Sequence, residues 1–395
     1  MNGTAFYGGS FDPFTEGHMA IVSRALLQCD KLIIGVGVNP DKKGLLSEDQ
    51  RVDLIKASLN DFVSFYQHRN LSVKDFSYEE QLAAIKLIDY PHCVDVVSYT
   101  GLTVDAAIKY EADVLIRGER LVGDHDAEMQ LAHINNELCE IRGYNLQHLQ
   151  IPVPKADLTY VSSTAVKTLL AEGEYIVAMK YVSPSVHNFL CEKMLREHEY
   201  SKLTNGTCQS YGALVRECQK KKYHNFSHIA YMLNFLKIFK VLHSDLLIPS
   251  KVIEMAIFWH DFLHSEVDSA AFAYDVAKKV GLDDSDWVKN LVLATNHRSP
   301  IISGPKETYT GLIHDLDLAI LGDVQNYGAY AWKIRLECKD NLVSYAEYVK
   351  GRVELLNSFL KRDRIYFTEY FYERFEENAR ENIRKERDFW LSKKL

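Results

Sequence analysis

The sequence predicts an α/β domain with a Rossmann-like parallel sheet, followed by an all-α domain. In the first half, short β-branched runs alternate with helical patterns, an order typical of a parallel sheet covered on both faces. In the second half, strand signals fade and long helix-periodic segments dominate. The 395 residues are too many for one typical core. We therefore expect two domains, residues 1–199 and 204–395.

The first domain is expected to contain five strands, each followed by a helix. The strands are expected at Gly3–Tyr7, Leu32–Val38, Val94–Tyr99, Asp113–Arg117 and Gln147–Val153. The helices are expected at His18–Cys29, Glu48–Leu59, Val104–Tyr110, Asp124–Cys139 and Thr164–Glu172. Ser47 and Gln50 have the spacing of a capping box, which starts the second helix. Ligands of such folds bind beyond the carboxyl ends of the strands.

The second domain is expected to be helical throughout. A helix over Ser185–Glu199 leads into a polar, weakly patterned stretch, Tyr200–Ser210, where we place the boundary. Helices are then expected at Gly212–Lys222, Ser227–Val241, Lys251–Phe262, Ala270–Val280, Asp286–Thr295, Leu312–Leu321, Tyr327–Lys339, Tyr345–Leu360 and Glu369–Trp390. The closing segment Glu369–Leu395 alternates charges, which favours an exposed, salt-bridged helix.

Composition excludes several classes of function. The net charge of −8 argues against nucleic acid as the main partner, because phosphate backbones select basic surfaces. The seven cysteines are scattered and form no Cys-x-x-Cys pair, which indicates reduced thiols in a cytoplasmic protein. The chain shows no apolar run of membrane-spanning length, and its N-terminus lacks the pattern of a signal peptide. We expect a cytoplasmic protein that does not bind membranes.

The run Gly8–His18 predicts phosphate chemistry. It lies between a short apolar run and a helical pattern, so it is expected to form a turn from strand to helix. Glycines allow the backbone to approach a phosphate closely, and a helix N-terminus presents unpaired N–H groups and a positive dipole end. His18 falls in the first helical turn, where a phosphorus centre would lie. An ordinary turn with a surface histidine is the alternative.

Three further clusters follow predicted strands at the same edge of the sheet. Asn39–Lys43 supplies lysines, and Arg117–Arg120 supplies two guanidinium groups, which bind phosphate through bidentate hydrogen bonds. Val161–Thr164 precedes a helix and offers hydroxyl and N–H groups to an anion. Each cluster alone is more often a solvated loop. Together they predict a nucleotide-binding pocket.

These motifs resemble, in order and approximate spacing, those of bacterial phosphopantetheine adenylyltransferases, over about Met1–Glu192. The resemblance implies transfer of the adenylyl group of ATP to 4′-phosphopantetheine, giving dephospho-coenzyme A and pyrophosphate, with Mg²⁺ as cofactor. It also implies a homo-oligomer. Nicotinamide and nicotinate mononucleotide adenylyltransferases share the glycine-rich opening, so a different acceptor is the alternative. Two departures bear on the acceptor: Glu119 replaces the usual leucine, and the segment 61–93 is longer than usual.

The resemblance also implies roles for individual residues. Ser10 and Lys42 would contact the acceptor phosphate, Arg117 would lie on the pantetheine-phosphate side, and Gly101 and Leu102 would line the pantetheine arm. The nucleotide side would comprise Gly9, Ser10, Phe11, Gly17, His18, Arg120, Glu128 and Ser163. The acceptor phosphate is itself an anionic nucleophile, so catalysis needs charge neutralisation rather than a strong base, and His18, Lys42 and Arg117 are the expected catalytic residues.

A second set of residues predicts a metal site. His224 and His228 face the same way on a helix, His260 and Asp261 are adjacent, and Asp317 precedes an apolar run. Histidine and carboxylate ligands suit a hard or borderline divalent metal. A single histidine on an apolar helix is more often a packed core residue. Two carboxylates in apolar surroundings, however, need a compensating charge, which a metal supplies.

This order resembles the HD superfamily of metal-dependent phosphohydrolases, an all-α fold, over about Thr204–Leu395. The resemblance implies that His228, His260, Asp261 and Asp317 bind Mn²⁺, Fe²⁺, Mg²⁺ or Zn²⁺, and that His224 protonates the leaving group. A domain that binds a nucleotide without cleaving it is the alternative. His297 and Asp315 would serve a second metal or the substrate, or be structural. Arg335, Arg352 and Arg362 are candidate phosphate contacts, with solvated helix faces as the alternative.

Overall fold

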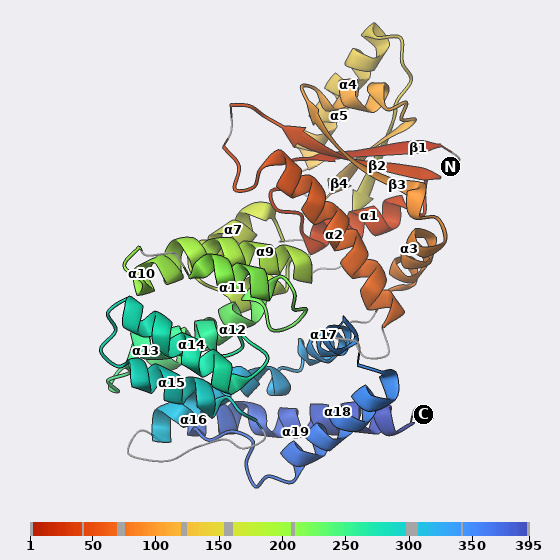
Figure 1. Cartoon of the computed structure of the whole chain (residues 1–395). Coiled ribbons are helices and arrows are strands. Elements are labelled where there is room, and N and C mark those ends of the chain that lie inside the picture. Colours follow the sequence, from red (N-terminus) through yellow and green to blue (C-terminus); the bar gives the residue numbers. More distant parts are fainter. Residues whose placement is uncertain are drawn as a thin grey trace. The chain divides into compact units, whose positions relative to one another are not determined.

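The computed structural model describes residues 3–41, 43–68, 76–119, 125–153, 161–206, 210–297, 307–340 and 343–392. The chain divides into two compact units, of which one ends at His187 and the other continues from Asn188 (Figure 1). This division lies earlier than the predicted boundary at Tyr200–Ser210. Tyr200 is fully buried and packs against Tyr211, with ring centroids 4.9 Å apart, so it belongs to the core of the second unit.

The first unit is built on a five-stranded parallel sheet, which confirms the predicted fold class. Its strands are β1 (Thr4–Gly9), β2 (Lys31–Val38), β3 (Val94–Thr100), β4 (Val114–Glu119) and β5 (Gln147–Pro152). The strand order is β3-β2-β1-β4-β5. The chain adds β2 and β3 on one side of β1 and then adds β4 and β5 on the other, so the order of the strands reverses between β1 and β4. In doubly wound sheets a ligand binds at this switch point, beyond the carboxyl ends of the strands. The turn at Gly8–His18 therefore lies where a ligand is expected.

Helices cover both faces of the sheet. Successive residues of β1 point to opposite faces: Phe6 packs with α4 (Thr103–Lys109), whereas Ala5 and Tyr7 pack with α1 (Glu16–Ala25). The face of Tyr7 also receives α2 (Glu48–Gln67) and α3 (Tyr78–Asp89), and the face of Phe6 receives α5 (His125–Ile141), as Figure 1 shows. Both faces are buried, which explains the continuous apolar runs of the strands.

One glycine of β4 lies close against a side chain of α1. A Cβ atom added at Gly118 would lie 2.1 Å from the Cδ1 atom of Ile21, so a larger residue would require that side chain to move. Gly118 therefore leaves room for Ile21 between α1 and β4. Three helices complete this unit or lead out of it: α7 (Ser163–Ala171), α8 (Tyr175–Met179) and α9 (Pro184–Met194).

The longer connection over residues 61–93 forms the end of α2 and the helix α3. Ser77 and Glu80 make a capping box that starts α3. Lys86 of α3 donates hydrogen bonds to the carbonyl oxygens of Leu26, at 2.7 Å, and of Cys29, which end the α1 segment. Since α1 begins at the carboxyl end of β1, its last turn lies at the opposite edge of the sheet. The described part of this segment is therefore remote from the edge where the acceptor is expected.

The second unit is helical in all its described parts. After α9 the chain forms a π-helical stretch, Leu195–Tyr200, and the short α10 (Ser201–Leu203). The remaining helices are α11 (Tyr211–Cys218), α12 (Phe226–Leu242), α13 (Ser250–Trp259), α14 (Glu266–Lys279), α15 (Ser285–Ala294), α16 (Glu307–Leu318), a 3-10 turn (Ala319–Gly322), α17 (Tyr327–Asp340), α18 (Tyr345–Leu360) and α19 (Glu369–Ser392). None of the described helices is long and apolar enough to cross a membrane.

The last helix is more deeply packed than its alternating charges suggest. Phe371, Ile383 and Trp390 of α19 are buried, and so is Glu386. Glu386 forms a bidentate ion pair with Arg352 of α18, at 2.8 and 2.9 Å. The expectation of an exposed, salt-bridged helix is therefore wrong for this face, because its charged residue is neutralised inside the core.

Candidate functional sites

The turn after β1 is held in place by two side chains, Asp12 and Arg51. Asp12 accepts hydrogen bonds from the N–H groups of Leu45, at 2.9 Å, and Leu46, at 3.0 Å, which tie the loop after β2 to the turn. Arg51 donates to the carbonyl oxygens of Ser10, at 2.8 Å, and Gly37, at 3.0 Å. The carboxyl ends of β1 and β2 are therefore fixed relative to each other before any ligand binds.

His18 is buried, not exposed, and its ring is held in one orientation. The Thr15 N–H donates to Nδ1 of His18 at 3.0 Å, and the Thr15 hydroxyl accepts the His18 N–H, which makes a capping box at the start of α1. The ring lies between Phe11 and Phe14, with centroids 5.1 and 5.4 Å away. Because Nδ1 accepts a hydrogen bond, the neutral ring carries its proton on Nε2. Thr15 belongs to the predicted run Gly8–His18, but its role as the cap of α1 was not predicted.

The N-terminus of α7 meets the same turn. Ser162 caps this helix through the N–H of Ala165, and the Ser163 hydroxyl donates to the carbonyl oxygen of Pro13 at 2.8 Å. Lys167, one turn further along, lies 3.3 Å from the Asp12 carboxylate. Two helix N-termini, those of α1 and α7, thus adjoin one turn, and each favours an anion. Lys167 is a cation of this site that sequence reasoning missed.

The other predicted residues of this site are placed by the strands. Arg117 lies on β4, one residue beyond Ile116, which pairs with Tyr7 of β1. Gly101 follows β3 with a φ of 84°, a left-handed value that favours glycine, and Leu102 is exposed. Gly9 is the last residue of β1, Ser10 follows it directly, and Gly17 lies in α1 beside His18. Lys42, Arg120 and the side chains of Glu119 and Glu128 lie outside the described residues.

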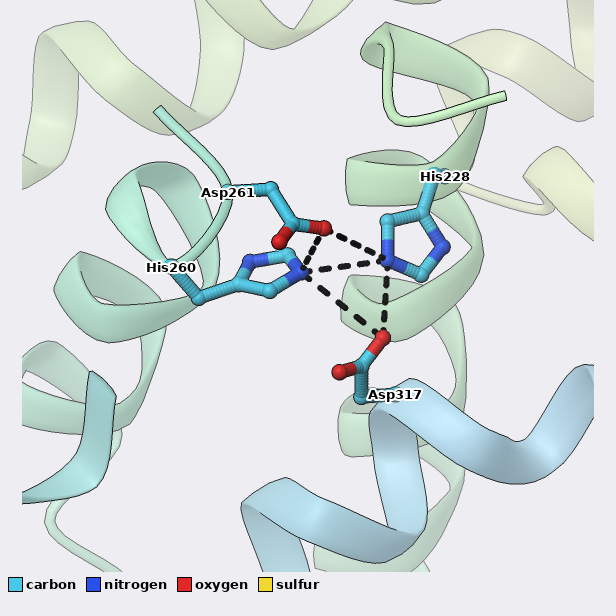
Figure 2. Close-up of side chains that lie close together, drawn as sticks. All are labelled: His228, His260, Asp261 and Asp317. Carbon is cyan, nitrogen blue, oxygen red and sulfur yellow. Dashed lines mark hydrogen bonds and ion pairs between the residues drawn. The ribbon is translucent and has the colours of Figure 1, made fainter. Parts of the chain in front are cut away.

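In the second unit, three helices bring four predicted metal ligands together. His228 comes from α12, His260 and Asp261 from the end of α13, and Asp317 from α16, as Figure 2 shows. One donor atom of each residue lies within 4.8 Å of all the others. Nε2 of His228 is 3.0 Å from Oδ1 of Asp317, and Nε2 of His260 is 2.9 Å from Oδ2 of Asp261. This set of two imidazoles and two carboxylates can hold a divalent metal.

A backbone carbonyl group holds the ring of His260 on the side away from the cluster. Its Nδ1 lies 2.9 Å from the carbonyl oxygen of Ile257, which keeps the proton on Nδ1 and leaves Nε2 for the cluster. Asp317 is buried, as its apolar neighbours in the sequence indicate, and His228 is buried too, whereas the Asp261 side chain is 33% exposed. The prediction of burial is wrong for Asp261, because it lies just beyond the end of α13. The cluster is therefore open to solvent on the Asp261 side.

The charges of the cluster are strongly coupled. Burial disfavours the charged form of His260, but the carboxylates of Asp261 and Asp317 outweigh it and raise the pKa to about 9. Burial lowers the pKa of His228. Although burial acts in the opposite direction, the imidazoles of His297 and His260 hold the pKa of Asp317 well below its usual range. Without a metal, the two carboxylates thus favour the protonated form of the neighbouring imidazole of His260. A bound cation would supply the same positive charge.

His224 lies beside the cluster and is held by Glu337, a residue that sequence reasoning missed. Nδ1 of His224 is 2.6 Å from Oε1 of Glu337, and Nε2 is 3.8 Å from Oδ2 of Asp261. The other oxygen of Glu337 accepts the N–H groups of Lys222, Tyr223 and His224. Despite burial, Asp261 and Glu337 raise the pKa of His224. In its protonated form, His224 thus presents an Nε2–H group toward the proposed metal ligands.

Among the remaining residues that were candidates for a second metal, the substrate or a phosphate, one adjoins the cluster and three have other contacts. Nε2 of His297 lies 3.1 Å from Oδ2 of Asp317, so His297 adjoins the cluster. Asp315 does not: it accepts the N–H groups of Phe367 and Thr368 and is a structural residue. Arg352 is buried in its pair with Glu386, and Arg335 lies over the ring of Tyr348, so neither lies on a solvated helix face.

Known proteins resemble the first unit. Residues 6–67 match the family profile described as Cytidylyltransferase-like. A phosphopantetheine adenylyltransferase of Clostridium botulinum (strain Hall) is 35% identical over 170 residues, which cover 43% of this chain and 83% of that protein. The Rhizobium meliloti (strain 1021) enzyme of that name is 35% identical over 190 residues, covering 48% of this chain and 98% of that protein.

Among solved structures, Plasmodium falciparum nicotinic acid mononucleotide adenylyltransferase complexed with NaAD aligns with a TM-score of 0.29 and 17% identity, over 50% of this chain and 98% of that one. The two bacterial enzymes are matched over most of their length, and the first unit has the switch point, the glycine-rich turn and the buried histidine described above. Through its N-terminal half, the chain belongs to the phosphopantetheine adenylyltransferase family.

Proposed function

We propose that the first unit transfers the adenylyl group of ATP to 4′-phosphopantetheine, giving dephospho-coenzyme A and pyrophosphate. The observation that carries this proposal is His18, buried at the N-terminus of α1 with its proton on Nε2. That proton can be donated to a non-bridging oxygen of the α-phosphate as negative charge develops in line with the acceptor. The family relationship supplies the substrates.

In this mechanism the protein neutralises charge rather than removing a proton. The phosphate of the acceptor attacks as an anion, so the obstacle is the repulsion between it and the triphosphate. Lys42, Arg117 and Arg120 would face these oxygens, and the N-termini of α1 and α7 add N–H donors. Mg²⁺ bound with ATP supplies further positive charge. Glu128 and Ser163 would hold the nucleotide, and Ser10, Gly101 and Leu102 the acceptor.

The test is pyrophosphate release from ATP by the intact chain with 4′-phosphopantetheine, compared with the His18→Ala variant. The His18→Ala variant should release pyrophosphate far more slowly, while its fold is retained by the packing of Phe11 and Phe14. Nicotinate and nicotinamide mononucleotides serve as competing acceptors. Turnover of a mononucleotide in preference to 4′-phosphopantetheine would overturn the assignment of the acceptor.

We infer that the second unit is a metal-dependent phosphohydrolase of the HD superfamily. The observation that supports this is the convergence of His228, His260, Asp261 and Asp317 from three helices. A bound divalent ion would supply Lewis acidity toward water and a phosphate oxygen. His224, whose Nε2 faces the cluster, would give its proton to the leaving group. Glu337 fixes the ring of His224 in that orientation.

Two measurements on the intact chain test the second activity. Metal analysis should find an ion that is lost in His228→Ala and in Asp317→Ala. Release of phosphate from pyrophosphate and from nucleotides with Mn²⁺ should be lost in the same variants; pyrophosphate comes first because the proposed transfer produces it. An intact chain that binds metal and a nucleotide but cleaves none of these compounds would instead favour a nucleotide-sensing domain.

A further inference from the structure

Buried polar atoms without partners gather beside the metal ligands. Among the described residues, Nδ1 of His297, Nε2 of His314 and Nη1 of Arg362 have no hydrogen-bond partner. His314 is fully buried, and Arg362 is half-buried. Buried polar groups are almost always hydrogen-bonded, because an unmade bond costs the desolvation of the group. Three such atoms close together point to a partner outside the described residues, and a bound ligand would satisfy all three.

These three residues form one cluster that adjoins the proposed metal centre. The rings of His297 and His314 meet edge to face, with centroids 5.6 Å apart. Arg362 donates through Nη2 to the carbonyl oxygen of His297, and its guanidinium lies 4.5 Å from the centroid of the Phe359 ring. Nε2 of His297 lies 3.1 Å from the carboxylate of Asp317, one of the ligands in Figure 2. The cluster therefore contacts Asp317, one of the four proposed metal ligands.

Arg362 brings a positive charge without a described counter-ion. Two arginines nearby in the chain, Arg364 and Arg380, pair with Glu369 and Glu376, whereas Arg362 makes no ion pair with any described carboxylate. Burial lowers the pKa of Arg362, and arginine nevertheless stays charged at neutral pH. A partly desolvated guanidinium is a strong binding group for an oxyanion, because its planar fork donates two parallel hydrogen bonds.

We propose that Arg362, His297 and His314 form a subsite that binds the phosphoryl group of the substrate next to the metal. The proposal rests on the phosphohydrolase function inferred above and specifies its substrate as a compound with a charged phosphoryl group. Arg362 binds the phosphoryl oxygens through Nη1. The unpartnered nitrogens of the two histidines donate further hydrogen bonds to these oxygens when they carry a proton.

A second metal ion suits this place less well. The fixed positive charge of Arg362 would repel a divalent cation. Asp315 lies 3.5 Å from Nδ1 of His314, but its oxygens accept hydrogen bonds from Phe367 and Thr368. Among the described residues, Asp317 is the carboxylate beside this cluster that is not held by these backbone N–H groups, and it already faces His228 at 3.0 Å.

The test measures the binding of inorganic phosphate to the intact chain loaded with one equivalent of Mn²⁺, without ATP. The readout is the relaxation that bound Mn²⁺ causes in the ³¹P nucleus of phosphate, which excludes phosphate held far from the metal. The part of this relaxation that is lost in the His228→Ala variant is assigned to phosphate bound beside the metal of the second unit. Arg362→Gln should raise the Kd for phosphate about tenfold, the loss expected for one charged hydrogen bond. Arg364→Gln, the matched control, should leave it unchanged.

Metal content separates this proposal from the one it rests on. Arg362→Gln should retain the Mn²⁺ stoichiometry of the parent chain, and Arg362→Lys, which keeps the charge but not the fork, should lose less phosphate affinity. An unchanged Kd in Arg362→Gln with Mn²⁺ retained would overturn the subsite and leave the metal centre standing. A second Mn²⁺ that is lost in His297→Ala would also overturn it. A parent chain that binds no Mn²⁺ would refute the phosphohydrolase itself.

Discussion

Glu337 and His224 form the shortest ion pair at the proposed metal centre, with 2.6 Å between Oε1 and Nδ1. The carboxylate is anchored by three backbone N–H groups, which together with His224 hold its pKa at about 2 although burial acts in the opposite direction. It is therefore charged at neutral pH, and it orients Nε2 of His224 toward the proposed metal ligands.

Glu337→Gln should slow hydrolysis mainly through kcat. The amide keeps the shape of the side chain but loses the negative charge, so the ring of His224 is less well held in its protonated form. We expect a fall of about 10-fold to 100-fold in kcat, part of the contribution typical of general acid catalysis. The KM and the metal content should change little. The pH above which kcat declines should move down, because Glu337 raises the pKa of His224; a uniform loss at all pH values would indicate a structural role.

Thr15→Val should impair adenylyl transfer although Thr15 need not contact substrate. The substitution removes the hydroxyl that caps α1 and that lies 2.9 Å from Nδ1 of His18, at a cost of about 1 kcal/mol in the free energy of unfolding. The backbone N–H of residue 15 still donates to Nδ1 of His18, so the ring keeps one of its two contacts with this residue. The kcat for pyrophosphate release should therefore fall about tenfold. Thr15→Ser, which keeps the hydroxyl, is the control. Equal rates in both variants would show that the cap has no part in orienting His18.

Metal affinity of the second unit should rise with pH. The pKa of His260 is about 9 in the metal-free chain and about 6.5 in an unfolded one. Because its folded pKa is raised, the protonated ring stabilises the metal-free fold below about pH 6.5, and that contribution is lost as the pH rises through 9. A metal must displace this proton, so Mn²⁺ affinity should increase about tenfold per pH unit between pH 6.5 and 8.5. Calorimetric titration in buffers of different ionisation enthalpy would count the released proton.

Lys86→Met should weaken the first unit without changing its acceptor. The lysine hydrogen-bonds to two carbonyl oxygens at the end of α1, so its loss should lower the free energy of unfolding by about 1–3 kcal/mol. Because this contact lies at the sheet edge opposite the glycine-rich turn, the KM for 4′-phosphopantetheine should stay the same. Thermal unfolding and steady-state kinetics check the two expectations. A changed KM would show that the segment 61–93 shapes the acceptor site.

Local patterns of the sequence were sufficient to predict the sheet and most of its helices. The strands β1, β2 and β4 each contain a short apolar run, and the capping box at Ser47 and Gln50 forms as expected. The sequence also pointed to the four residues of the proposed metal site, because aspartates in apolar surroundings are uncommon unless their charge is balanced. Glu337 could not be predicted, since 113 residues separate it from His224 and glutamate is ordinary on a helix surface. The link between Arg362 and His297 spans 65 residues and has no local signature either.

Two carboxylates two residues apart on α16 have separate tasks. Asp315 secures the backbone of Phe367 and Thr368, just before α19 begins, while Asp317 faces the histidines. One carboxylate therefore stabilises the fold, and the other belongs to the proposed metal site. A chelator that removes the proposed metal ion should leave an inactive helical domain that stays folded and can bind the ion again.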